Sequence, residues 1–187
     1  MVAYDPDGDR LAFALGAPSQ NAAAYVPQHL RQAAEPGAVF ELAPGALSIA
    51  SELGRRVATH GGAAILVDYG RSETRLEATL QAVRRHEPAD VLSAPGTADL
   101  TAHVDFPLLA QAAREAGAAV HGPVPQRDFL QGLGLDQRAE ILKRQASPEQ
   151  QSQIDTGHHR LTAEDQMGTL FQAMAFVPPG YGVPAGF

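Results

Sequence analysis

The stretch GGAAILVDYG, residues 61–70, decides how we interpret this sequence. Its two glycines end a helical pattern, and an apolar run without polar alternation follows them. Such a run is typical of a strand that helices cover on both faces in a parallel sheet, so we expect a strand over 63–68. Asp68, Tyr69 and Gly70 come directly after the run, at the end of the strand where open parallel sheets bind their ligands.

Helical and extended patterns alternate on both sides of this strand. Residues 46–60 and 106–116 predict helices, and Asp105 precedes the second of these at its N-cap position. Together with the central strand, the alternation indicates an α/β fold. Further helices are expected over 27–33, 76–86, 127–133, 136–145 and from Ser147 onward, and further strands at 39–42, 90–92, 118–121 and 169–177.

The first fifteen residues predict a β-hairpin. Apolar runs at 2–4 and 11–15 flank the sequence DPDG, whose proline and Asp-Gly pair favour a tight reversal. The first strand begins at Met1, which leaves almost no chain before it to cover that edge. A natural domain seldom starts in this way, so we expect the chain to be the later part of a larger fold.

Composition excludes several classes of protein. With 187 residues, 44% hydrophobic and 19% charged residues, the chain is typical of a folded globular protein. Its net charge of −7 repels phosphate backbones and acidic membrane surfaces, so neither nucleic acid nor a membrane is an expected partner. Cysteine is absent, and Lys143 is the only lysine that could serve as a nucleophile.

Common nucleotide and hydrolase motifs are missing. The sequence contains no GxxxxGK[ST], GxSxG or HExxH pattern. The segment ELAPGA, residues 41–46, stands between a predicted strand and a predicted helix, as a cofactor turn would. However, alanine occupies two positions where glycine would let the backbone approach a ligand, so we do not assign it a cofactor role.

A second polar segment, PGTADLTAHVDF at residues 95–106, places four polar residues at a spacing of two. If the segment is extended, these side chains project to one side and could clamp a guanidinium group or bind a metal ion. Metal binding is the weaker interpretation of this segment. The corresponding alternative function is a metal-dependent hydrolase built on Asp99, His103 and Asp105. The four residues are Asp99, Thr101, His103 and Asp105.

Four ordered motifs carry a family resemblance: residues 61–70, APGTADLTAHVDF at 94–106, PVPQRDFLQGLGLDQRAEIL at 123–142 and MGTLFQAMAFVPPG at 167–180. They resemble the C-terminal half of the MidA-like S-adenosylmethionine-dependent methyltransferases. The mitochondrial member of that family is an arginine methyltransferase needed for respiratory complex I assembly. The resemblance extends from the hairpin to the end of the chain.

The resemblance implies a partial class I methyltransferase fold, with a Rossmann-like sheet, flanking helices and the N-terminal hairpin. The family's glycine-rich cofactor loop lies upstream of the matched motifs. We therefore expect one domain over 1–187 that lacks the N-terminal cofactor-binding half, with S-adenosylmethionine as the family's cofactor. The implied partners are a protein with an accessible arginine and either a second copy or a complementing N-terminal half. The implied location is the bacterial cytoplasm or the mitochondrial matrix.

Methylation of an arginine needs carboxylates that hold the planar guanidinium and take up its proton. We expect Asp68 and Asp99 to act in this way, with Tyr69 as a pocket wall and hydrogen-bond donor. Substrate contacts are expected from Gly70, Thr101, His103 and Asp105. In the competing structural interpretation, Asp68 caps a turn and Gly70 supplies a positive φ. The alternative function is a non-catalytic interaction module whose open sheet edge is covered by a partner.

Overall fold

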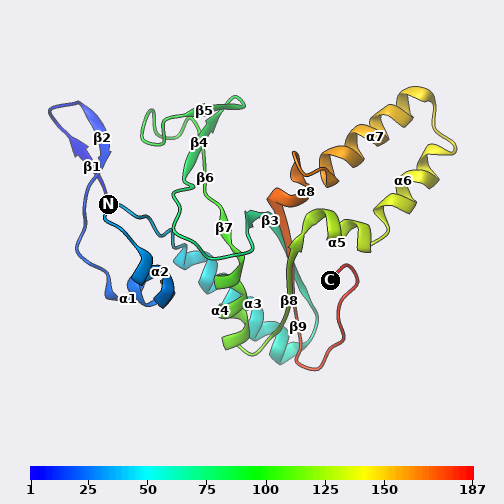
Figure 1. Cartoon of the computed structure of the whole chain (residues 1–187), viewed down its shortest axis with the longest axis horizontal. Coiled ribbons are helices and arrows are strands. Elements are labelled where there is room, and N and C mark those ends of the chain that lie inside the picture. The colour runs from blue at the N-terminus through cyan, green and yellow to red at the C-terminus, as the bar shows by residue number, and fades with distance from the viewer. The chain divides into compact units, whose positions relative to one another are not determined.

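The structure is a computed structural model that describes residues 1–187, apart from the side chains of residues 20 and 21. The chain forms two compact units, shown with their elements in Figure 1. Unit 1 comprises residues 1–42 and 75–103, and unit 2 comprises residues 43–74 and 104–187. Unit 1 contains two sheets and unit 2 contains one, and the chain passes from unit 2 into unit 1 and back again between strands β3 and β7.

Unit 2 is built on a four-stranded sheet in the order β7-β3-β9-β8. Its long strands β3 and β9 pair antiparallel from Ala64 opposite Phe176 to Tyr69 opposite Phe171. β8 also pairs antiparallel with β9, whereas the short β7 pairs parallel with the end of β3. The bounds are Ala64–Arg71 for β3, Val104–Asp105 for β7, Ala119–Pro125 for β8 and Phe171–Val177 for β9.

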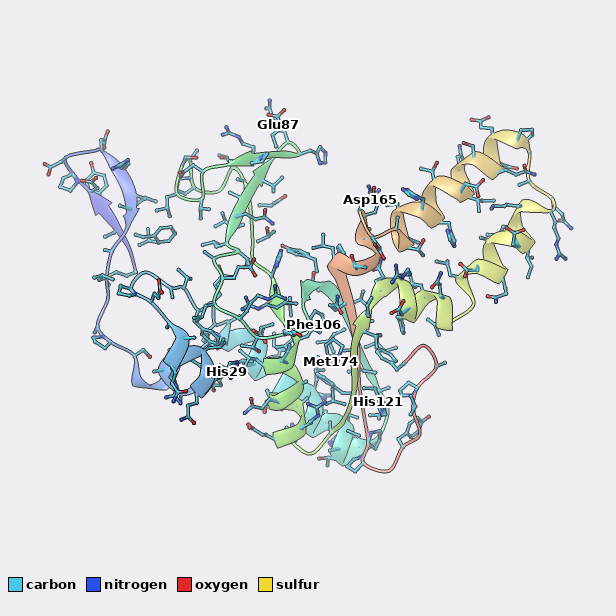
Figure 2. The ribbon with its side chains drawn as sticks, in the orientation of Figure 1. His29, Glu87, Phe106, His121, Asp165 and Met174 are labelled. Carbon is cyan, nitrogen blue, oxygen red and sulfur yellow. The ribbon has the colours of Figure 1, made fainter. Side chains whose placement is uncertain are left out.

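The core of unit 2 surrounds β9. Its sequence FQAMAFV is almost entirely apolar, and every residue from Ala173 to Val177 is fully buried. Figure 2 labels Met174 on this strand and Phe106 at the start of helix α4, and both side chains are completely buried. The unbroken apolar run of β9 is thus shielded from water on both faces of this strand.

Helices α3, Pro44–His60, and α4, Phe106–Glu115, pack closely against each other in unit 2. The remaining helices are α5, Gln126–Gly132; α6, Leu135–Lys143; α7, Pro148–Thr162; and α8, Met167–Leu170. Figure 1 shows α6 and α7 side by side as a helical hairpin. α7 begins with a capping box, in which Ser147 and Gln150 satisfy each other's backbone amides.

Unit 1 contains a two-stranded and a three-stranded sheet. β1, Val2–Asp5, and β2, Arg10–Phe13, form the antiparallel hairpin, and β4, Gln81–Arg84, lies between its antiparallel neighbours β5 and β6. The tight β4–β5 turn places Arg85 and His86 at positive φ. The other elements are β5, Glu87–Ala89; β6, Asp99–Thr101; α1, Gln20–Ala24; and α2, Gln28–Ala33.

The structure confirms the expected α/β fold and several of its elements. The N-terminal hairpin, the helices at 44–60 and 106–115, and the closing strand are present. Asp105 caps α4 and Gly117, at positive φ, follows its end, as the sequence predicted. None of the described helices combines the length and the apolar character that a membrane crossing requires.

Four structural predictions were wrong. Residues 76–86 are not helical but lead into β4, because the amides of Thr79 and Leu80 donate to the Glu41 carboxylate instead of to helix carbonyls. No strand forms at 39–42, and β5 forms at 87–89 instead of 90–92. β3 is not covered on both faces, since Ile65 is 58% and Val67 44% exposed.

The close approach of α3 to α4 depends on Gly54. A methyl group at this position would lie 2.8 Å from the Ala113 carbonyl oxygen, a backbone atom that cannot move aside on its own. We expect Gly54→Ala to lower the free energy of unfolding by about 1–3 kcal/mol through overpacking. Gly157 on α7 has open space around it, so Gly157→Ala is the matched control and should raise stability by roughly 0.5–1 kcal/mol. Urea denaturation of both variants measures the difference, and equal effects would contradict the packing argument.

Candidate active site

The carboxyl end of β3 presents the first group of predicted site residues. Asp68 is exposed, and one oxygen of its carboxylate accepts a hydrogen bond of 2.8 Å from the Tyr69 backbone amide. The Tyr69 ring packs at a tilt of 59° against Phe171, with 5.8 Å between ring centroids. The end of β3 therefore carries a carboxylate that solvent reaches, followed by an aromatic ring that packs against β9.

Gly70 is required by close packing. Gly70 does not have a positive φ, so the interpretation that it supplies one in a turn was wrong. A methyl group at Gly70 would overlap the Val104 carbonyl oxygen and lie 3.0 Å from the Phe106 ring. Glycine is therefore what allows β7 to pair with the end of β3.

Asp105 is the centre of a buried polar cluster in unit 2. One carboxylate oxygen accepts from Arg71 Nε at 3.1 Å, and the other accepts from the Thr74 hydroxyl at 2.8 Å and the Leu108 amide at 3.1 Å. The Arg71 and Asp105 side chains are only 4% and 9% exposed. The sequence predicted Asp105 as the cap of α4 but did not predict Arg71 and Thr74. These two residues lie 34 and 31 positions before Asp105, a separation that leaves no local sequence pattern.

Unit 1 holds the other predicted residues. Asp99 and Thr101 lie on β6, and the His103 backbone amide donates to the Thr79 hydroxyl at 2.9 Å. Glu41, which we did not predict, accepts from the Thr79 and Leu80 amides and from the Thr79 hydroxyl. Its carboxylate fixes the segment before β4, and its separation of 38 residues from Thr79 explains why sequence patterns do not reveal it.

The expected single row of polar side chains from Asp99 to Asp105 does not form. β6 ends at Thr101 and β7 begins at Val104, and the two strands belong to different sheets. Unit 2 brings Asp68, Tyr69, Gly70 and Asp105 to one end of β3, while Asp99, Thr101 and His103 belong to unit 1. A shared role for Asp68 and Asp99 stays a prediction.

Asp99 lines a cavity of about 770 Å³ within unit 1. The β4–β5 hairpin and the loop before β6 form its walls, and Figure 2 shows Glu87 at the hairpin tip. Both signs of charge line this cavity, which suits a polar segment of another molecule better than an apolar ligand. Its charged residues are Arg84, Arg85, Glu87 and Asp99.

The strand-to-helix connections of the described residues contain few glycines. Of the strand-to-helix connections, the one between β2 and α1 has a single glycine, Gly16, and those leading into α4 and α5 have none. The segment ELAPGA at 41–46, to which we assigned no cofactor role, leads into α3 without a strand before it. A methyl group at Gly45 would have no neighbouring atom within 4 Å. Within the same described part, no three potential metal ligands are grouped, so the hydrolase alternative gains no support.

Lys143 is not available as a neutral nucleophile. Its ammonium group pairs with Asp155 on α7 and with Glu140 at 3.3 Å. The hydrogen bond to Asp155 is the main cause that raises the Lys143 pKa, and that to Glu140 raises it further. At neutral pH the amine therefore stays protonated, and it fastens α6 to α7.

Breaking the buried Arg71–Asp105 pair should be costly. Asp105→Asn keeps a side chain that can cap α4 but removes the charge that compensates Arg71. We expect the free energy of unfolding to fall by about 3–5 kcal/mol. The exposed Asp128, 53% accessible beside Arg127, provides the matched control. Asp128→Asn should cost less than about 1 kcal/mol, and chemical denaturation of the two variants separates a buried pair from a surface pair.

Comparison with known proteins extends these observations. The profile of a family described as S-adenosyl-L-methionine-dependent methyltransferase matches residues 1–124. The mitochondrial protein arginine methyltransferase NDUFAF7 of Rattus norvegicus is 38% identical over 180 residues, which cover 95% of this chain and 40% of the relative. The homologue from Caenorhabditis elegans is 33% identical over 156 residues, covering 79% of this chain and 36% of that protein. The chain thus spans about two fifths of the length of these relatives.

Solved structures agree with the sequence matches. A superfamily member from Burkholderia thailandensis, bound to S-adenosyl-homocysteine, matches all of this chain and 48% of its own, with 27% identity and a TM-score of 0.80. A native crystal structure from the same bacterium also has a TM-score of 0.80, with 24% identity, over 100% of this chain and 50% of that one, and supports the fold alone. The chain therefore belongs to the MidA-like family of S-adenosyl-L-methionine-dependent methyltransferases.

Proposed function

We propose that this chain is the acceptor-side part of a protein arginine N-methyltransferase that uses S-adenosylmethionine. The observation that carries the proposal is the 38% identity to mitochondrial arginine methyltransferases over 95% of the chain. The exposed Asp68 at the carboxyl end of β3 supports it, because ligands of α/β sheets bind at that end.

The cofactor would supply an activated methyl group, so the protein's task is to hold and orient the acceptor. The described residues lack a glycine cradle, so we assign the adenosyl-binding role to the part of the family fold that the match does not cover. The chain covers only 40% of the rat protein, so the remaining part of that relative is large enough to bind the adenosyl group.

On the acceptor side, Asp68 and Asp99 would hold the guanidinium group through paired hydrogen bonds. A guanidinium nitrogen becomes nucleophilic only as its proton leaves, and an exposed carboxylate can accept that proton. Tyr69 would form the pocket wall, and Thr101 and His103 would contact the flanking polypeptide. Asp105 is better placed to support the site from beneath, since Arg71, Thr74 and Leu108 already occupy its oxygens.

The proposed substrate is a protein with an accessible arginine. The proposed assembly contains this chain and the cofactor-carrying half of the family fold, with a dimer of this chain as the alternative. In a eukaryote the mitochondrial names of the relatives favour the mitochondrial matrix, and in a bacterium we expect the cytoplasm.

Methyl transfer tests the acceptor assignment. We would join the upstream segment of the rat relative to this complete chain and measure transfer of tritiated methyl groups to an arginine-rich protein. Asp68→Asn and Asp99→Asn should each lower turnover at least about tenfold, because a positioned proton acceptor typically contributes 10²–10⁴-fold. Asp165→Asn changes a carboxylate that is 76% exposed and has no assigned role, so it should leave turnover unchanged. Wild-type rates in both active-site variants would refute the assignment.

Calorimetric titration with S-adenosylmethionine tests the cofactor assignment separately. We expect saturable binding by the joined protein and much weaker binding by the chain alone, because the described residues provide no glycine cradle. If the joined protein folds but binds no cofactor, the non-catalytic interaction module becomes the better interpretation. Tight binding by the chain alone would instead contradict the assignment of the adenosyl site to the other half.

A further inference from the structure

The cavity of unit 1 contains two arginines that the acceptor assignment does not use. Arg84 ends β4 and Arg85 begins the turn to β5, and both line the cavity together with Asp99. Every lining residue lies between Val83 and Asp99, so this one segment of the chain forms the cavity. A ligand that enters it meets cationic and anionic side chains at once.

Neither arginine has a carboxylate partner among the ion pairs of the described residues. By contrast, Arg71 and Arg127 bind carboxylates at 3.1 Å and 3.2 Å. Arg84 is paired in register with Glu87 across the β4–β5 ladder, but these two are not among the described ion pairs either. Both guanidinium groups are exposed and therefore ready to bind a carboxylate from another molecule.

The turn that carries Arg85 has a backbone that favours other residues. Arg85 has a φ of 55° and His86 a φ of 67°, and a two-residue turn with positive φ at both positions is of type I′. Asparagine and glycine fill such turns most readily, because a larger side chain crowds the backbone in this conformation. Strained residues are concentrated at sites of recognition and catalysis. The turn thus points to a use of the Arg85 side chain beyond forming the hairpin.

The loop before β6 forms another wall of the cavity and fixes its own conformation. The Asp90 carboxylate accepts the backbone amides of Leu92 and Ser93, both at 2.9 Å. Further along, the Thr97 hydroxyl donates to the Ala94 carbonyl at 2.7 Å. Local hydrogen bonds therefore hold this wall in place before a ligand arrives, which reduces the entropy that binding must remove.

We propose that this cavity selects the acceptor arginine through an acidic residue close to it in the substrate sequence. The carboxylate of that residue would bind Arg85, with Arg84 beside it, while Asp99 holds the acceptor guanidinium. The substrate segment then presents one positive and one negative side chain to the two signs of charge in the cavity. This inference rests on the function proposed above, because it names the substrate class of the same site.

The β4–β6 ladder sets the spacing between the two substrate charges. Asp99 is paired in register with Val83, and Arg85 follows Val83 by two positions. Two residues of a strand span about 7 Å and neighbouring strands lie about 5 Å apart, so the backbones at Asp99 and Arg85 are roughly 8 Å apart. An extended peptide covers that distance in about two or three residues. We therefore expect the acidic residue two or three positions from the acceptor arginine.

A carboxylate suits this cavity better than a phosphate group does. Glu87 and Asp99 already give the cavity two negative charges, and the whole chain has a net charge of −7. A strongly anionic ligand would be repelled, whereas a segment with one arginine and one acidic residue is neutral. Recognition is therefore local, through the guanidinium groups, and not through a general attraction of acidic proteins.

Peptide binding to the complete chain tests the proposal. The probe is a fluorescein-labelled peptide of glycine and serine that carries a central arginine and a glutamate two residues away on either side. Fluorescence polarisation measures its dissociation constant. Replacing both glutamates of the peptide by glutamine should weaken binding at least about fivefold, because charge-assisted hydrogen bonds to the arginines are lost.

Variants of the turn identify the residue that reads the glutamate. Arg85→Gly places the residue that best suits the turn, so the chain should stay folded and lose most of its preference for the glutamate peptide. Arg85→Glu should reverse the preference, so that the glutamine peptide binds more tightly. Arg31→Glu makes the same change of charge at an exposed position on α2 that does not line the cavity, and it should keep the original preference.

Methyl transfer by the joined protein separates recognition from a structural role. Arg85→Gly should raise KM for the glutamate peptide at least about fivefold and leave kcat unchanged, because the lost contact serves binding alone. Equal dissociation constants for the glutamate and glutamine peptides would overturn the proposal. Equal effects of Arg85→Glu and Arg31→Glu, or a lack of saturable binding by both peptides, would overturn it as well.

The two proposals can fail separately. Binding that requires the arginine of the peptide but not its glutamates would refute the acidic neighbour and keep the acceptor assignment. Binding that requires the glutamates, but stays unchanged when the peptide arginine becomes glutamine and when Asp99→Asn is introduced, would refute the acceptor role of Asp99. In that case Arg85 would keep its role as a carboxylate-binding residue.

Discussion

The structure of unit 2 depends on the buried ion pair between Arg71 and Asp105. Arg71 ends β3 and Asp105 is the N-cap residue of α4, so one 3.1 Å contact connects the sheet to this helix. Neither side chain would tolerate burial alone, because an unpaired charge in this environment is strongly destabilising. Two further hydrogen bonds, from Thr74 and Leu108, satisfy the remaining carboxylate positions, which is the condition under which a buried pair is retained.

The end of β3 has one buried acid and one exposed acid close to it. Asp105 lies below the strand end with its oxygens occupied, while Asp68 lies on it with an exposed carboxylate. Gly70 lets β7 approach the end of β3, so Asp105 on β7 pairs with the same strand that carries Asp68. Under the proposed function, this supported strand end would carry Asp68 in place before the acceptor arrives.

Local patterns predicted those parts of the fold whose stabilising contacts are local. The helical periodicity of 46–60, the Asp105 cap and the Asp-Gly hairpin each involve residues close in sequence, and all are present. The helix expected at 76–86 failed because Glu41, far away in the chain, takes the amides that a helix would use. Likewise, the end of β3 was recognised as a candidate site from its strand position. The sequence could not reveal Arg71 and Thr74 as buried residues of this strand end, because their shared partner Asp105 lies more than thirty residues away.

The excursion of the chain through residues 75–103 has a structural consequence of its own. It departs after Thr74 and returns at Val104, and the Thr74 hydroxyl binds the Asp105 carboxylate at 2.8 Å, so entry and exit are fastened together. A segment whose ends meet in this way can be lengthened, shortened or exchanged at little cost to the body that carries it. Asp99 and its cavity lie within this excursion. Residues 75–103 could therefore change in length or sequence while the sheet of unit 2 and its ion pair stay the same.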